Sequence, residues 1–158
     1  MHKVFLVLFF SSYIYSVDPV VIVNELINKN LYFTQNTNSG VEDVSSKGMI
    51  FRTNESIEIT IEHPSKEKYI IKDSFIEIYD YEFNQSQMFE INDDNSFVID
   101  LLDNGIDTKN VNYIDEHSFT VTKNKSDFFV KIISDAKFTI SYSDNMNYEN
   151  NIVFEAID

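Results

Sequence analysis

Hydrophobic and polar residues alternate through residues 56–91, and this alternation predicts four short strands in a row. In the clearest run, Ile57, Ile59 and Ile61 are separated by single polar residues, as in a strand with one buried and one solvated face. Turn-forming residues follow each run, and the four strands are expected at about 56–62, 68–72, 75–81 and 86–91. Short connections of this kind favour an antiparallel ribbon.

Upstream of the ribbon, the pattern predicts a helix and then two strands. Apolar residues recur at helical spacing from Pro19 to about Lys29, with Asp18 as a suitable N-cap and proline preorganised for the first turn. Strands are expected at 31–36 and 47–53, separated by a loop that contains Gly40.

Residues 96–105 break the strand rhythm. Apolar residues here occupy positions 97, 98, 99, 101 and 102, and Gly105 suits the left-handed residue that ends a helix. The segment is therefore expected to be a short helix that is apolar on more than one side. Such a helix either fills an ordinary core or covers an apolar pocket, and the pattern alone leaves both open.

Beyond residue 107 the alternation resumes, with candidate strands at 111–114, 118–123, 128–133, 137–142 and 151–156. The total is ten or eleven strands and two helices. Strands at roughly ten-residue spacing indicate one curved antiparallel sheet in a single domain, residues 17–158.

The first sixteen residues resemble a secretory signal peptide. A basic start, Met1-His2-Lys3, precedes an apolar run at 4–10 that is too short to span a bilayer. Cleavage after Ser16 is expected, and an uncleaved membrane anchor is the alternative.

Charge and composition narrow the classes of function. The net charge is −14, and no cluster of Lys and Arg is present, which argues against binding nucleic acid or an anionic membrane. The chain has no Cys, so it contains no disulfide or thiolate site.

The sequence offers little support for catalysis or for a bound cofactor or metal. His63 and His117 fall in predicted turns, and the aspartates at 93–107 do not have the spacing of a calcium loop. Nucleophile-elbow, phosphate-loop and zinc-protease motifs are missing. We expect no enzyme, although a hydrolase that uses a pair of carboxylates remains open.

Four motifs, in order, resemble those of a known family. They are Phe33-Thr34-Gln35, then Gly48-Met49-Ile50-Phe51, then Pro64 followed by Tyr69-Ile70-Ile71-Lys72-Asp73, and finally Ile78-Tyr79-Asp80-Tyr81-Glu82-Phe83-Asn84-Gln85. The order and content are similar to those of the outer-membrane lipoprotein carrier family, the LolA periplasmic chaperones. The last motif is the most specific.

The resemblance implies an incomplete β-barrel with an N-terminal helix and a short lid helix over an apolar cavity. It further implies a periplasmic carrier, without cofactor and monomeric, that binds lipoprotein acyl chains. Such a carrier receives its cargo from an inner-membrane lipoprotein-releasing ABC transporter and passes it to an outer-membrane lipoprotein receptor. A periplasmic binding protein for another lipid or amphiphile is the alternative.

The expected cavity and lid residues combine the strand pattern with this resemblance. They are Phe33, Phe51, Ile57, Ile59, Ile61, Tyr79, Phe97, Leu101 and Leu102. Arg52 is the candidate for the family's lid-contacting arginine, although it stands earlier than the usual Arg-Pro pair, whose place Asn54-Glu55 occupy.

Overall fold

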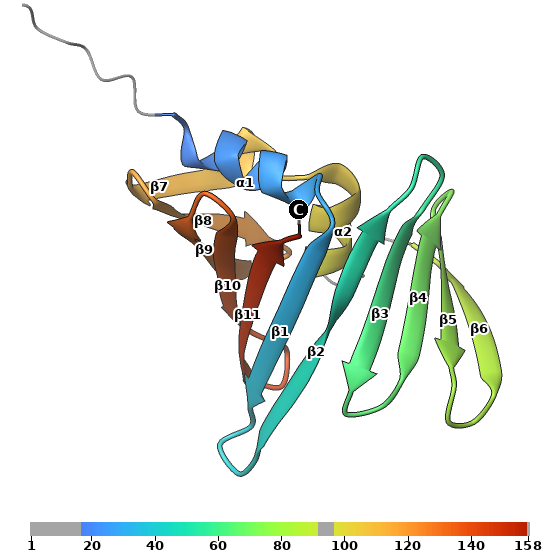
Figure 1. Cartoon of the computed structure of the whole chain (residues 1–158). Coiled ribbons are helices and arrows are strands. Elements are labelled where there is room, and N and C mark those ends of the chain that lie inside the picture. The colour runs from blue at the N-terminus through green and yellow to red at the C-terminus, as the bar shows by residue number, and fades with distance from the viewer. Residues whose placement is uncertain (1–16, 92–96, 158) are drawn as a thin grey trace, which may run out of the picture.

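The computed structural model describes residues 17–91 and 97–157, and a single antiparallel sheet of eleven strands dominates them (Figure 1). The strands are β1 Leu31–Asn38, β2 Asp43–Arg52, β3 Ile57–His63, β4 Glu67–Lys72, β5 Phe75–Asp80, β6 Gln85–Glu90, β7 Val111–Asp115, β8 Ser118–Lys123, β9 Ser126–Ser134, β10 Lys137–Ser143 and β11 Glu149–Ala156. Two α-helices, α1 Pro19–Ile27 and α2 Phe97–Asn104, and a short 3-10 helix, η1 Thr108–Asn110, complete the described chain.

The sheet consists of two meanders that meet at its centre. The strand order is β6-β5-β4-β3-β2-β1-β11-β10-β9-β8-β7, so neighbours are consecutive except where β1 pairs with β11. That pairing runs from Leu31 opposite Ala156 to Asn38 opposite Glu149. The sheet curves strongly but does not close, and β6 and β7 form its two edges (Figure 1). The structure confirms the predicted fold class, mainly β with one curved antiparallel sheet and two helices.

Helix α1 begins where the sequence predicts. The Asp18 carboxylate accepts a hydrogen bond from the Val20 backbone N–H at 2.9 Å, and Pro19 occupies the first turn. The side of the helix that carries Val23 and Leu26 is buried, and the helix lies across one end of the curved sheet (Figure 1). The apolar spacing of the helix is thus explained by packing against the core.

Phenylalanines from three adjacent strands form the centre of the core. The register places Phe154 of β11 between Phe33 of β1 and Phe138 of β10. The Phe138 and Phe154 rings are stacked with centroids 4.9 Å apart, and both side chains are almost completely buried. Burying one such side chain contributes about 1.5–3 kcal/mol, so this row is a major source of stability where the two meanders meet.

The main difference from the predicted strands is the length of β1 and β2. The expected loop around Gly40 shrinks to a tight turn, because Asn38 donates to the Asp43 carboxylate at 2.7 Å and Ser39 N–H donates to the Glu42 carbonyl at 3.1 Å. Gly40 supplies the positive φ of +78° that this turn requires. Local polar contacts therefore extend the hairpin further than the apolar pattern does.

Two predictions concern residues outside those described, namely the signal peptide at 1–16 and residue 96, the first of the helix expected at 96–105. Within residues 17–91 and 97–157, neither helix has the length and hydropathy needed to cross a bilayer.

Candidate ligand-binding cavity

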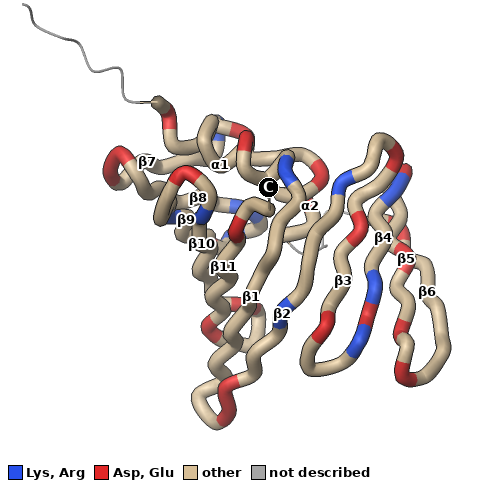
Figure 2. Tube along the Cα trace, in the orientation of Figure 1, with Lys and Arg blue, Asp and Glu red and all other residues tan. Residues whose placement is uncertain are grey.

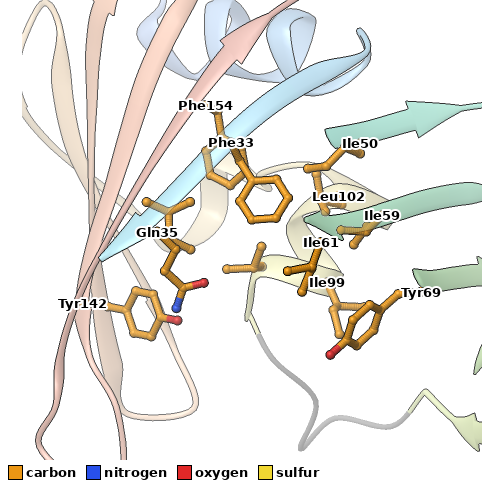
Figure 3. Close-up of a pocket in the computed structure, with 12 residues that line it drawn as sticks. Phe33, Gln35, Ile50, Ile59, Ile61, Tyr69, Ile99, Leu102, Tyr142 and Phe154 are labelled. Carbon is orange, nitrogen blue, oxygen red and sulfur yellow. The ribbon is translucent and has the colours of Figure 1, made fainter. Parts of the chain in front are cut away.

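An apolar cavity of about 270 Å³ lies between the concave face of the sheet and α2 (Figure 3). Side chains from six strands and from α2 line it. Nine of them are aliphatic or phenylalanine side chains: Phe33, Ile50, Ile59, Ile61, Val98, Ile99, Leu102, Ile152 and Phe154. The other three carry polar groups: Gln35, Tyr69 and Tyr142. A lining that is mostly apolar with a few polar groups is typical of a small-molecule site.

The strand register brings the cavity wall together. Ile59 of β3 stands between Ile50 of β2 and Tyr69 of β4, so the three side chains form a row on the concave face. Gly48 makes room beside them, because a Cβ at this position would lie 2.9 Å from a ring carbon of Phe33 and 2.0 Å from the Thr60 carbonyl oxygen. A side chain at residue 48 would therefore collide with the wall.

Different sides of α2 face the cavity and the core. Val98, Ile99 and Leu102 line the cavity. Phe97 instead stacks on Phe128 of β9 with ring centroids 3.8 Å apart, and Leu101 is completely buried. The two roles that the sequence left open for this helix, filling a core and covering a pocket, are thus both present on one short element.

Two side chains, Arg52 of β2 and Asn24 of α1, hold the C-terminal end of α2 and the residues that follow it. The Arg52 guanidinium donates to the Ile27 carbonyl at the end of α1, at 2.6 Å, and to the Leu102 carbonyl of α2. The Asn24 amide exchanges two hydrogen bonds with Ile106, accepting from its N–H at 2.8 Å and donating to its carbonyl at 3.1 Å. The Arg52 bonds satisfy carbonyls that the C-terminal ends of the two helices leave unpaired, and the Asn24 bonds satisfy both backbone groups of Ile106, just after α2.

Arg52 is a suitable residue for this position. Burial lowers the pKa of Arg52 from its usual value, and the nearby Asp103 carboxylate opposes that change, so the side chain remains a cation. A positive charge beside the C-terminal carbonyls of two helices is electrostatically favourable. The predicted lid-contacting arginine accordingly lies at α2, where it donates to the Leu102 carbonyl.

A polar network forms the end of the cavity at β1, β11 and β10. The Asn150 amide oxygen accepts from Gln35 at 3.1 Å and from the Thr37 hydroxyl at 2.7 Å, while the Asn150 amide nitrogen donates to the Tyr148 carbonyl at 3.1 Å. Tyr142 lies beside this network, and burial, followed by the charge of Asp144, raises the pKa of its hydroxyl. The hydroxyl therefore stays neutral at physiological pH.

At the opposite end, Tyr69 is already paired. Its hydroxyl donates to the Glu67 carboxylate at 2.6 Å. Burial is the main reason that the pKa of Tyr69 is raised, and the bond to Glu67 adds to the effect. The Tyr69 hydroxyl is thus hydrogen-bonded to a neighbouring side chain, whereas the Tyr142 hydroxyl has no such partner among the described residues.

The lining of the cavity contains no charged side chain. A polar groove of about 520 Å³, lined by Asp43, Asp127 and Glu149 and by no lysine or arginine, lies on the other face of the sheet, because Glu149 has the opposite strand parity to Asn150. Acidic residues are distributed along most of the described chain, and basic residues are spread over several elements, β2 and β4 among them (Figure 2). An anionic group in the cavity would therefore find no cationic partner in its lining.

The structure separates the predicted cavity residues into three groups. Phe33, Ile59, Ile61 and Leu102 line the cavity. Ile57, Phe97 and Leu101 are buried in the core beside it.

Phe51 and Tyr79 lie on the convex face. Phe51 is 39% exposed, and the strand register places Tyr79 on the face opposite to Ile78 and Tyr69. Their assignment to the cavity wall needs correction, because side chains of a strand alternate between faces and these two have the wrong parity.

Eight lining residues were not among those expected: Gln35, Ile50, Tyr69, Val98, Ile99, Tyr142, Ile152 and Phe154. Parity alone identifies Gln35 from Phe33, and Ile50 from its register with Ile59. Tyr142 and Ile152 become neighbours of β1 only through the β1–β11 pairing, which joins segments more than a hundred residues apart and leaves no local signal.

The candidate catalytic residues are not assembled into a site. His63, at the end of β3, and His117, in the turn after β7, are both exposed and belong to opposite halves of the sheet. No group of three or more His, Asp or Glu side chains in the described ranges is arranged to hold a metal ion.

No protein-family model matches the chain, and no curated protein matches it. Solved structures with a similar arrangement include a LolA superfamily protein from Nitrosomonas europaea, with 10% identity, a TM-score of 0.48, and coverage of 90% of this chain and 94% of that one. A DUF1329 family protein from Desulfovibrio piger has 11% identity, a TM-score of 0.39, and coverage of 90% and 92%. A redesigned β-barrel has 8% identity, a TM-score of 0.38, and coverage of 86% and 96%. Similarity at this level does not indicate what this chain binds.

Proposed function

We propose that this protein binds the acyl chain of an amphiphile in the cavity under α2. The observation that carries the proposal is the cavity itself, where nine aliphatic or phenylalanine side chains line about 270 Å³ between the sheet and a helix. Covering this apolar surface with hydrocarbon removes it from water, which is favourable.

The resemblance of the four ordered motifs to the LolA periplasmic chaperones supports a more specific role. In that role the protein is a periplasmic, monomeric carrier of outer-membrane lipoproteins. It takes them from the inner-membrane lipoprotein-releasing ABC transporter and delivers them to the outer-membrane lipoprotein receptor. The apolar run that precedes Ser16 supports export from the cytoplasm.

The size of the cavity adds a requirement for movement. A volume of about 270 Å³ falls just below the roughly 300–1,000 Å³ that is usual for ligand pockets, so a long chain needs α2 to shift outward. Burying about a dozen methylenes is worth roughly 10 kcal/mol, at about 0.8 kcal/mol each. The cost of moving α2 offsets part of this free energy, which keeps release possible.

A binding assay tests the general proposal. Residues 17–158 are titrated with the neutral dye N-phenylnaphthylamine, whose fluorescence rises in apolar surroundings, and the dye is then displaced with acyl compounds. Ile61→Trp, which fills the cavity, is expected to weaken binding about tenfold. Ile70→Trp is the matched control, because Ile70 is also a half-buried strand isoleucine but points to the convex face. Equal loss in both variants, or no binding to the unmodified protein, would refute the proposal.

The carrier role is tested separately. Purified protein is incubated with spheroplasts, and the supernatant is examined for released outer-membrane lipoprotein. The proposal predicts release that depends on the protein and is reduced by Ile61→Trp. Extraction of the purified protein and mass spectrometry of the bound fraction identify the alternative, a binder of another lipid or amphiphile.

A further inference from the structure

The polar end of the cavity contains two hydrogen-bonding groups that the protein itself leaves unused. Neither the Gln35 side-chain carbonyl oxygen nor the Tyr142 hydroxyl has a hydrogen-bond partner among residues 17–91 and 97–157. Both side chains line the cavity where β1 and β10 form its wall (Figure 3). Groups that are partly removed from water in this way gain free energy when a ligand supplies the missing partner.

The network behind Gln35 determines which of its amide atoms is available. The Asn150 amide nitrogen donates to the Tyr148 carbonyl at 3.1 Å, which directs the Asn150 oxygen toward Gln35 and Thr37. The Gln35 nitrogen must then be the atom that donates to Asn150, at 3.1 Å, and to the Thr37 hydroxyl, at 3.3 Å. Asn150 is only 6% exposed, so this arrangement is protected from water. The Gln35 oxygen is consequently an acceptor oriented away from the network.

An acceptor and a hydroxyl together select a particular head group. The Gln35 oxygen requires an N–H or O–H donor, whereas the Tyr142 hydroxyl can donate to a carbonyl. An amide next to an acyl chain offers both, with its N–H for Gln35 and its carbonyl for Tyr142. An ester offers only the carbonyl, and binding it would leave the Gln35 oxygen desolvated without a partner.

The lining of the cavity disfavours the third common head group. None of the twelve lining residues is a lysine or arginine, so a carboxylate or phosphate here would lose hydration without gaining a cationic partner. From the cavity, the network and this uncharged lining, we propose that the site selects N-acyl amides over O-acyl esters and over anionic fatty acids, with Gln35 and Tyr142 as the specificity-determining residues. This inference rests on the proposed function, because it assigns the head group of the acyl ligand bound there.

Three probes of one chain length test the selection: N-methyldodecanamide, methyl dodecanoate and dodecanoate, each displacing N-phenylnaphthylamine from residues 17–158. The amide is expected to bind roughly tenfold more tightly than the ester, and the carboxylate is expected to bind most weakly. Equal affinity for amide and ester would overturn the inference while leaving the proposed acyl binding intact. Failure of all three probes and of the dye to bind would refute both.

Substitutions locate the selection at the two residues. Tyr142→Phe removes a hydroxyl with no partner among the described residues, so the fold is expected to persist while amide affinity falls about fivefold to tenfold. Tyr79→Phe is the matched control, because that tyrosine lies on the convex face, away from the cavity, and its hydroxyl is paired with Glu77. Gln35→Met is expected to make amide and ester equivalent.

Dye affinity reports whether each variant retains the cavity. A Tyr142→Phe protein that binds the dye normally and keeps full preference for the amide would overturn the inference. The inference would also be overturned if Tyr79→Phe lowered the preference as much as Tyr142→Phe does.

Discussion

Asn24→Ala is expected to loosen the attachment of α1 to the segment that follows α2. The Asn24 side chain holds both backbone groups of Ile106, accepting at 2.8 Å and donating at 3.1 Å. Ile106 is only 7% exposed, so water reaches the freed N–H and C=O poorly. Each unsatisfied backbone group costs about 1–3 kcal/mol, and with partial relaxation we expect a loss of about 2–4 kcal/mol in the free energy of unfolding.

The assay is equilibrium urea unfolding followed by far-UV circular dichroism, with the midpoints compared at a common slope. Asn28→Ala is the matched control. Asn28 is also an asparagine, one helical turn after Asn24. Its side chain donates to the Asn24 backbone carbonyl at 3.0 Å, but it is exposed. Its loss is expected to cost about 0.5 kcal/mol, because water replaces an exposed hydrogen bond readily.

Amide hydrogen exchange gives a second, local measure. If Asn24 anchors α2, exchange in α2 should accelerate in Asn24→Ala, whereas the central strands should change only as much as global stability does. The reasoning is refuted if the two alanine variants lose the same stability, or if α2 exchanges at the unmodified rate in Asn24→Ala.

Three further changes test other parts of the structure. Gly48→Ala should lower the free energy of unfolding in urea by at least about 3 kcal/mol, because its Cβ would lie 2.0 Å from the Thr60 carbonyl oxygen. Gly40→Ala, in open space at a φ of +78°, should lower it by about 1 kcal/mol. Similar losses in the two variants would contradict the packing at Gly48. Asp18→Ala should lower stability by about 1 kcal/mol through loss of the cap on α1, measured as a lower melting temperature, and an unchanged value would argue against the cap. Burial raises the pKa of Tyr142, so the unfolded chain releases the hydroxyl proton at a lower pH than the folded protein does, and stability should decline as pH rises above about 10. The decline should be shallower in Tyr142→Phe. Identical pH profiles in the two proteins would contradict a buried hydroxyl.

Local pattern accounts for most of the fold. The alternation of Ile57, Ile59 and Ile61 correctly indicates a strand with a buried face, and the apolar run ending at Gly105 correctly indicates a helix. These signals are local because side-chain period and capping depend only on nearby residues.

The composition of the cavity was less predictable, because it depends on which strands become neighbours. Ile152 and Tyr142 reach the side of β1 only through the β1–β11 ladder, which no local pattern encodes. Tyr79 shows the opposite error, since its motif was conspicuous but its parity directs it to the convex face. Counting parity outward from Ile59 across the hairpins would have excluded it.

The pairing of β1 with β11 has a kinetic consequence. Every other ladder joins consecutive strands, so each meander can form from short-range hairpins, but the central ladder must close a loop from Asn38 to Glu149. Closing a long loop costs conformational entropy before burial of the phenylalanine row can offset that cost. Contacts between residues far apart in sequence therefore slow folding. We therefore expect two preformed halves to wait for one late, rate-limiting association, visible in pulse-labelling exchange as protection of β1 and β11 after that of the hairpins. Until then the apolar walls of the cavity would face solvent, which makes the unjoined halves the species most prone to aggregation.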